Sequence, residues 1–152
     1  TFSLYVQAIE DLQGFFAPSV FSIDPDEAPL ELALTPTYLR SVRSSASFCA
    51  ALARGEPSFF FLSPEPPGGV ERQADKARSR RLNREFAFLT AHETVPGHHL
   101  LDARRRGLGN PVRRQLESPL FYEGWATYAE SLLREKGYLQ GQAPHPVRLF
   151  QE

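Results

Sequence analysis

Three of the four histidines of the chain lie within eight residues, in the segment His92-Glu93-Thr94-Val95-Pro96-Gly97-His98-His99. In a metal-binding helix two histidines usually stand four residues apart, because these positions share a face and both imidazoles can reach one ion. Here the fourth position after His92 is Pro96, which has no ligand atom. On a straight helix His98 and His99 would lie about 9 and 10 Å further along the axis. A regular helix would therefore not bring these imidazoles together.

The dipeptide Pro96-Gly97 provides the irregularity that the site needs. Proline has no N–H to bond the carbonyl of His92, and glycine tolerates unusual backbone dihedral angles. We expect a bulge or break that absorbs two extra residues and brings His98 to the place of an i+4 histidine. We favour His92 and His98 as ligands, with His99 either as the alternative ligand or behind them, supporting the site or facing the substrate.

Glu93 and Glu123 supply the carboxylates of the predicted site. Zinc lowers the pKa of a bound water to about 7, and a neighbouring carboxylate such as Glu93 can take the proton as general base. Catalytic zinc typically has three protein ligands. Glu123 opens a second helical segment, Glu123-Gly124-Trp125-Ala126-Thr127-Tyr128-Ala129-Glu130, in which Gly124 and Ala126 leave room for close approach of another helix. The pattern predicts one zinc ion held by His92, His98 and Glu123.

Glu130 and two tyrosines surround these residues in the sequence. Glu130 shares a helix stripe with Glu123, so its carboxylate can accept a hydrogen bond from a ligating imidazole, or pair with Arg134 at i+4. Tyr122 and Tyr128 are typical of packing, with donation to an oxyanion as the alternative. We place Tyr128 with Glu130 and His99 in the group that supports the ligands or faces the substrate.

The remaining charged and titratable residues of this half have simpler interpretations. The run Arg104-Arg105-Arg106 is typical of a solvated helix end, where cations suit the helix dipole, and recognition of a substrate carboxylate is the alternative. His145 stands between two prolines and is interpreted as a loop residue.

Apolar spacing predicts the elements that must position these side chains. It indicates helices over 78–95, 100–106 and 122–136, the second with a left-handed stop at Gly107 and the third ending at Gly137. The apolar stretch from Phe2 to Leu12 also has helical character. Short strands are expected at 30–34 and 58–62. The apolar stripe of the third helix is Trp125, Tyr128, Ala129, Leu132 and Leu133.

Composition limits the fold and the partners. With 152 residues, 41% of them hydrophobic, the chain can bury one core, so we expect a single, mainly α domain over 1–152. The breaker Pro66-Pro67-Gly68-Gly69 divides a Pro- and Phe-rich part, 1–69, from a helical metal-site part, 70–152. A net charge of −1 argues against nucleic acid and anionic membranes as partners. The sequence has no run of 18 apolar residues, and its single Cys49 cannot close an internal disulfide.

The two ends of the sequence suggest a piece of a longer helical protein. There is no Met, and apolar segments run up to both ends. We therefore expect the remainder of a parent chain as a partner. A targeting segment would lie there, so cytoplasmic and exported locations are both compatible with the sequence.

The motifs at 92–99 and 123–130, with a weaker echo in Thr35-Pro36-Thr37-Tyr38-Leu39-Arg40, resemble those of the bacterial domain of unknown function 885 family. Members of that family are longer, largely helical proteins similar to zinc metallopeptidases. The resemblance implies a peptide-hydrolysing zinc site with His92, His98 and Glu123 as ligands and Glu93 as base, and a peptide as substrate. In that family further helices follow the second motif and complete the cleft, and little of that part follows Gly141 in this sequence.

Two functional hypotheses follow from these patterns. The first is a zinc metallopeptidase that cleaves peptide bonds with metal-activated water. The second is a metal-binding helical fragment, or a truncated inactive relative, without catalysis. A di-iron carboxylate bundle is disfavoured because it needs Glu-x-x-His pairs, which the sequence lacks.

Overall fold

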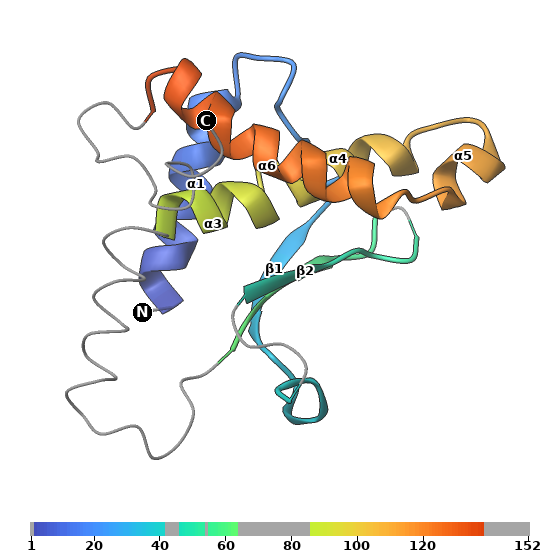
Figure 1. Ribbon diagram of the computed structural model, residues 1–152, viewed down its shortest axis with the longest axis horizontal. Helices are drawn as coiled ribbons and strands as arrows, with labels where there is room; N and C mark the ends of the chain where they lie inside the picture. Colours follow the sequence, from blue (N-terminus) through green and yellow to red (C-terminus); the bar gives the residue numbers. More distant parts are fainter. Residues whose placement is uncertain (1, 42–45, 54, 64–85, 139–152) are drawn as a thin grey trace.

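The computed structural model of the protein describes residues 2–41, 46–53, 55–63 and 86–138 (Figure 1). The described part is mainly α-helical, with one small sheet, as expected. The helices are α1 (Phe2–Phe16), α3 (Phe86–Glu93), α4 (His98–Arg106), α5 (Pro111–Gln115) and α6 (Pro119–Glu135), with a short 3-10 helix at Thr37–Leu39. The strands are β1 (Leu30–Leu34), β2 (Ala46–Cys49) and β3 (Ser58–Leu62). Figure 1 shows α3, α4 and α6 in a helical layer beside the sheet.

The sheet has the strand order β1-β3-β2, with β3 in the centre. β1 pairs with β3 in parallel, with Leu32 opposite Phe60, and β2 pairs with β3 antiparallel, with Phe48 opposite Phe60. The predictions for β1 and β3 are confirmed to the residue. β2 was not foreseen, because its four residues, ASFC, are too few to show the alternation of a half-buried strand.

Two apolar clusters stabilise the packing of α1, α3 and α6 against one another and of α1 against the sheet. Tyr5 of α1 packs edge-on against Phe60 of β3 and Phe86 of α3, with ring centroids 5.7 and 4.6 Å away. The larger cluster joins α1, α3 and α6 through Leu12, Phe16, Phe88, Ala91, Val95 and Leu133. The predicted helical character near the N-terminus is therefore confirmed, and α1 supports the helix that carries His92.

The observed helices differ from the predicted ones at several boundaries. α3 ends at Glu93, two residues before the expected end, and the predicted residues 78–85 lie outside the described part. α4 begins at His98 instead of residue 100. Gly107 has φ −74°, a right-handed conformation, so the expected left-handed stop there is wrong. Gly137 has φ +81° and follows α6 in the left-handed conformation that favours glycine.

The helix α6 begins at Pro119, three residues before the expected start, since proline suits the first turn of a helix, where its missing N–H costs no bond. Its buried positions are Ala126, Ala129, Leu132 and Leu133. Trp125 is half-buried and Tyr128 is 46% exposed. The predicted apolar stripe therefore includes two residues that do not belong to the buried face of α6.

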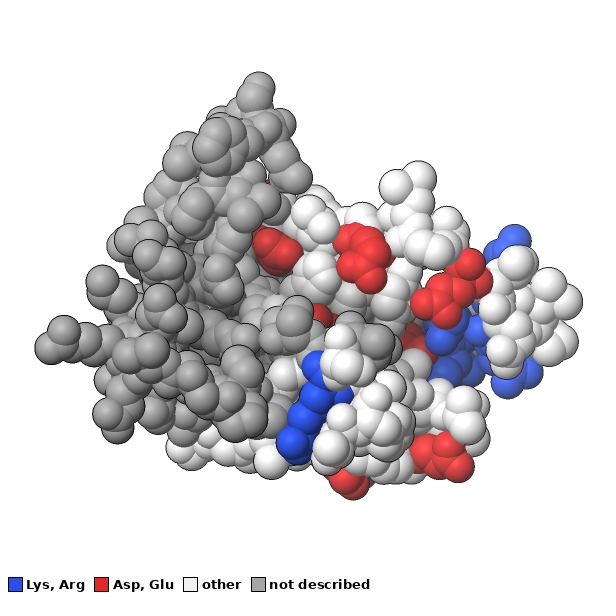
Figure 2. All heavy atoms as spheres, turned by 60° about the horizontal axis from the view of Figure 1, so that its bottom comes forward, with Lys and Arg blue, Asp and Glu red and all other residues white. Residues whose placement is uncertain are grey.

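The charge of the surface and the division of the chain at 66–69 were also predicted from the sequence. Figure 2 shows acidic and basic side chains near one another on one face, in keeping with the net charge of −1. Among the described helices, none combines the length and apolar character needed to cross a membrane. The breaker at 66–69 and His145 both lie outside the described residues.

Candidate metal centre

The segment between α3 and α4 breaks the helix at Pro96-Gly97, as the sequence predicts. The Val95–Pro96 peptide bond is cis, and the backbone N–H of Gly97 donates to the carbonyl of Ala91, six residues back, at 2.9 Å. A Cβ atom at position 97 would lie 1.9 Å from the carbonyl oxygen of His92. Only glycine fits this close approach, so the backbone can separate α3 from α4 and reorient His98 relative to His92.

The break brings three potential ligands together. The donor atoms of His92, His98 and Glu123 all lie within 4.8 Å of one another. Glu123 Oε2 is 3.4 Å from His92 Nε2 and 3.6 Å from His98 Nε2. Donors bound tetrahedrally to zinc at 2.0–2.1 Å are separated by about 3.3–3.4 Å. The two separations from Glu123 are close to this value, and the whole set lies within 4.8 Å, so two imidazole nitrogens and one carboxylate oxygen form a donor set suited to zinc.

The three donors lie at the edge of a cleft of about 540 Å³. His98 is buried, whereas the side chain of Glu123 is 63% exposed and faces solvent. The cleft is lined by β2, by Glu93 at the end of α3 and by His98 and Arg105 of α4. Glu117 and the first turns of α6, with Tyr122, complete the lining. The group is thus accessible to a ligand the size of a short peptide segment.

The second ring nitrogen of His92 is occupied by Glu130 of α6. His92 Nδ1 lies 2.8 Å from Glu130 Oε1, which corresponds to the predicted support of a ligating imidazole by Glu130. Burial alone would lower the pKa of His92, but the hydrogen bond to Glu130 and the charges of Glu93, Glu130 and Glu123 together raise it. Arg134, the alternative partner of Glu130, lies instead over the ring of Phe88.

His98 lies against the aromatic rings of Tyr122 and Phe48. The ring of Tyr122 stacks on it, with centroids 4.1 Å apart and planes 14° apart. Burial, with the nearby His92, lowers the pKa of His98 to about 4, so the imidazole is neutral near pH 7, the form that binds metal. Burial also raises the pKa of Tyr122, which keeps its proton and remains a hydrogen-bond donor in the wall of the cleft.

Glu93 lines the same cleft and is fixed by the sheet. Its Oε2 accepts a hydrogen bond from the backbone N–H of Phe48 in β2 at 2.8 Å, and the residue is 8% exposed. Sequence reasoning missed Phe48, because a backbone amide carries no signal in the residue type. β2 therefore belongs to the site as much as the helices do.

Trp125 connects α6 to the Pro96-Gly97 segment between α3 and α4 by a hydrogen bond. Its Nε1 donates to the carbonyl oxygen of Pro96 at 2.8 Å. Ala126 is fully buried on the inner face of α6, as close approach requires. Gly124 is exposed, and a Cβ atom there would meet nothing within 4 Å, so the expected role of Gly124 in helix approach is wrong.

His99 and Tyr128 are placed away from the three donors. His99 is 1% exposed, and its Nε2 lies 3.0 Å from the carbonyl oxygen of Ala28. Tyr128 packs against Trp125 on the outer side of α6. Neither side chain is among those that line the cleft, so the structure does not bring them to the cleft.

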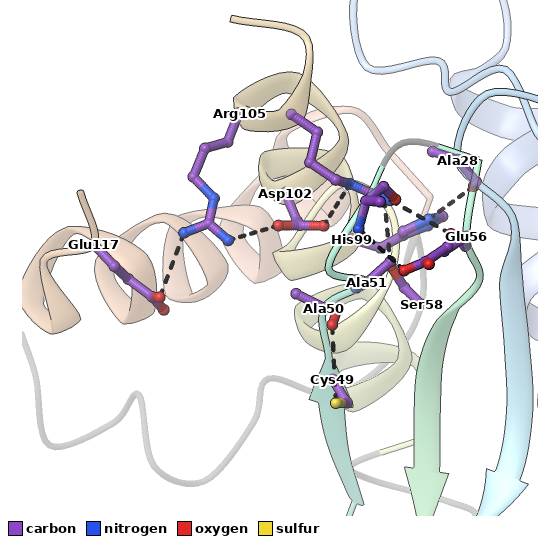
Figure 3. A network of polar contacts seen from close by, with 12 residues as sticks. Ala28, Cys49, Ala50, Ala51, Glu56, Ser58, His99, Asp102, Arg105 and Glu117 are labelled. Atoms are coloured by element: carbon purple, nitrogen blue, oxygen red, sulfur yellow. Dashed lines mark hydrogen bonds and ion pairs between the residues drawn. The ribbon is translucent and has the colours of Figure 1, made fainter. Parts of the chain in front are cut away.

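Arg105 and Arg106 of α4 are largely buried and make specific contacts, so their interpretation as a solvated helix end is wrong, whereas Arg104 is exposed. Asp102, which is fully buried, pairs with Arg105 at 2.8 Å and with Arg106 at 2.9 Å (Figure 3). Arg104 donates to the carbonyl oxygens of Val20 and Ser22. The i+3 and i+4 spacing of Asp102 with the arginines is the sequence signal that could have revealed this network.

Comparison with known proteins identifies the family. The sequence pattern of the family described as bacterial protein of unknown function (DUF885) matches residues 2–151. The chain belongs to this family. No curated protein matches this DUF885 chain.

A solved structure similar to this DUF885 chain is that of "the putative lipoprotein from Colwellia psychrerythraea", with a TM-score of 0.70 and 22% sequence identity. The match covers 91% of this chain and 22% of that chain. The DUF885 chain thus spans less than a quarter of the length of that protein, and the likeness shows the fold.

Proposed function

We propose that this protein is a zinc-dependent hydrolase, a metallopeptidase that cleaves peptide bonds. One observation carries the proposal: the donor atoms of His92, His98 and Glu123 converge within 4.8 Å at the edge of a cleft that Glu93 also lines. Two nitrogen donors and one oxygen donor suit zinc better than magnesium or calcium, which prefer oxygen.

The arrangement favours a catalytic over a structural zinc site. Structural sites are closed by four protein ligands, whereas catalytic sites have three and an open position. Among the described residues the group has three members, and the side chain of Glu123 is 63% exposed. When bound, the ion would supply Lewis-acid activation of a water molecule and of the substrate carbonyl.

Glu93 is the proposed general base. Its carboxylate takes one proton from the water that attacks the carbonyl carbon, and it passes this proton to the amine when the C–N bond breaks. The hydrogen bond from Phe48 N–H holds the carboxylate in the cleft before substrate arrives. Glu93 is therefore unchanged after one cycle, and water has been added across the peptide bond.

The edge strand β2 supports a peptide as the substrate. β2 lies at one side of the described sheet, and residues 46–50 line the cleft. The Phe48 N–H is directed at Glu93, so the backbone of this residue faces the cleft and not β3. Because Glu93 occupies the Phe48 N–H, an extended peptide would pair with the remaining outward-facing backbone groups of β2, and this pairing would place successive carbonyl groups of the peptide along the cleft.

The test combines metal analysis with a Glu93→Gln variant. We expect the purified protein to contain about one zinc per chain and to hydrolyse short peptides. Gln keeps an oxygen that accepts the Phe48 N–H bond but cannot take a proton, so the variant should retain zinc and lose about 10²- to 10⁴-fold in kcat. Glu135→Gln, at the exposed end of α6, is the matched control and should behave as the parent protein.

Each other outcome counts against a particular part of the proposal. A Glu93→Gln variant with full activity would remove Glu93 as the base. Stoichiometric zinc without turnover of any peptide would favour the second hypothesis, a metal-binding relative without catalysis. A protein that takes up no zinc would refute the metal centre itself.

A further inference from the structure

Arg105 brings a positive charge into the cleft of the candidate metal centre. Among the described residues that line this cleft, it contributes the only guanidinium group. The neighbouring charged side chains in the lining are the carboxylates Glu93, Glu117 and Glu123. An arginine in such a place can grip a planar anionic group through two parallel N–H bonds.

One side of the Arg105 guanidinium is fixed from inside the protein. Its Nη2 donates to Asp102 Oδ1 at 2.8 Å, and Asp102 is fully buried (Figure 3). Asp102 also pairs with Arg106, so one buried negative charge is shared by two arginines. Because a buried carboxylate needs its partners, Asp102 holds Arg105 in position and leaves its charge only partly balanced.

The other side of the guanidinium has a weaker partner. Arg105 Nη1 lies 3.4 Å from Glu117 Oε2, and the Glu117 side chain is 49% exposed. Strong bonds between charged groups are shorter, about 2.7–2.9 Å, and exposed pairs contribute little. A carboxylate of a bound molecule can therefore take the place of Glu117 at small cost.

An apolar pocket adjoins the cleft at the same point. The two share Arg105, Glu117 and Tyr122, and the pocket has a volume of about 240 Å³. Its apolar lining comes from Leu101, Leu108, Leu116 and Phe121. The pocket next to Arg105 is thus large enough for a large apolar side chain.

We propose that Arg105 binds a carboxylate group of the substrate, displacing Glu117, while an apolar side chain next to that carboxylate enters the adjoining pocket. The inference rests on the proposed function, since it names the class of peptide that the cleft accepts. A peptide offers such a carboxylate at its C-terminus or on an acidic side chain.

Binding to the zinc-loaded Glu93→Gln variant tests this without turnover. The probes are acetyl-Ala-Ala-Ala-Phe as free acid, the same peptide as C-terminal amide, and the amide of acetyl-Ala-Ala-Glu-Phe, each titrated by calorimetry. We expect the free acid to bind about 10-fold or more tightly than the plain amide. Tighter binding of the glutamate-bearing amide than of the free acid would assign the carboxylate to a side chain.

Three further substitutions, each made in the Glu93→Gln variant, test whether Arg105 causes the preference for the free acid. Arg105→Gln should abolish the preference for the free acid, and Asp102 keeps Arg106 as its partner in that variant. Glu117→Gln should enlarge the preference, because the competing carboxylate is removed. Arg114→Gln is the matched control, since Arg114 is exposed on α5 and lines neither cavity, and it should leave the preference unchanged.

Equal binding of all three probes, or no binding of any probe, would overturn the inference. A preference that survives Arg105→Gln would also overturn it, because the carboxylate would then be held elsewhere, for example by the zinc ion. Hydrolysis by the parent protein without a carboxylate preference rejects the role of Arg105 alone. A preference that depends on Arg105, in a protein that hydrolyses no peptide, rejects the proposed function alone.

Discussion

His92 and Glu130 are joined across the α3–α6 interface by a contact of 2.8 Å between Nδ1 and Oε1. This contact directs the Nδ1 proton toward the carboxylate and leaves Nε2, the atom 3.4 Å from Glu123, with its lone pair toward the candidate metal position. A ligating imidazole whose other nitrogen donates to a carboxylate is oriented and made more basic.

Substitution of Glu130 tests this coupling. Glu130→Ala should lower the zinc affinity by about 10- to 100-fold without abolishing binding, because the ligand stays but its orientation and basicity are lost. Competition with a chromophoric chelator measures the affinity. Glu135→Ala on the same helix should leave it unchanged, and an unaltered affinity in Glu130→Ala would show that the contact does not support a metal ligand.

Substitutions of the two adjacent histidines should have different effects. His98→Gln removes a predicted ligand, so zinc affinity should fall by more than about 100-fold, since a lost ligand costs more than a lost supporting contact. His99→Gln should retain zinc but lower the free energy of unfolding by about 1–3 kcal/mol, because a buried partner of the Ala28 carbonyl is changed. Elemental analysis and urea unfolding measure the two quantities. Loss of zinc in His99→Gln alone would reverse the ligand assignment.

A pair of glycine substitutions tests the geometry of the break. In Gly97→Ala the new methyl group would meet the backbone oxygens of His92 and Ala91 at 1.9 and 2.4 Å, so we expect a loss of more than about 4 kcal/mol, or no folding. In Gly124→Ala the methyl group meets nothing within 4 Å and lies in a helix, so we expect a gain of about 0.5–1 kcal/mol. Thermal unfolding followed by circular dichroism compares them. Equal stability of the two variants would contradict the tight turn at 97.

The metal-free protein should lose stability on mild acidification, partly through His99. Burial lowers the pKa of His99 to about 4, from 6.5 in the unfolded chain. Between these values the unfolded chain binds more protons than the native protein, so the contribution of His99 is complete above pH 6.5 and decreases as the pH falls toward 4. One such group adds at most about 1.4 kcal/mol per pH unit to the slope.

Urea unfolding of the chelator-treated protein between pH 7.5 and 5 measures this slope. His99→Gln should have a shallower pH dependence than the parent protein, because His92 and His98 titrate in both and cancel in the comparison. If the free energy of unfolding had the same pH dependence in both proteins, burial would not keep the His99 imidazole uncharged.

Local sequence determined much of the site. The absence of an N–H in Pro96, the freedom of Gly97 and the helical spacing of Glu123 and Glu130 act within a few residues, so the break and the helix that carries the third donor could be predicted. The strand at 30–34 could also be predicted, from its alternation of apolar with polar or small residues, and the strand at 58–62 from its aromatic run between prolines.

Tertiary packing decided the rest. Consecutive residues on a helix point about 100° apart, and only the position of α6 directs His98 to Glu123 while His99 turns to Ala28. The Phe48 N–H that holds Glu93 is 45 residues away in the sequence and has no signature in residue type. Residue types limit the backbone conformations of short segments, and these limits can be predicted from the sequence. Contacts between distant segments form only when the packing of the core fixes the relative positions of the helices and strands.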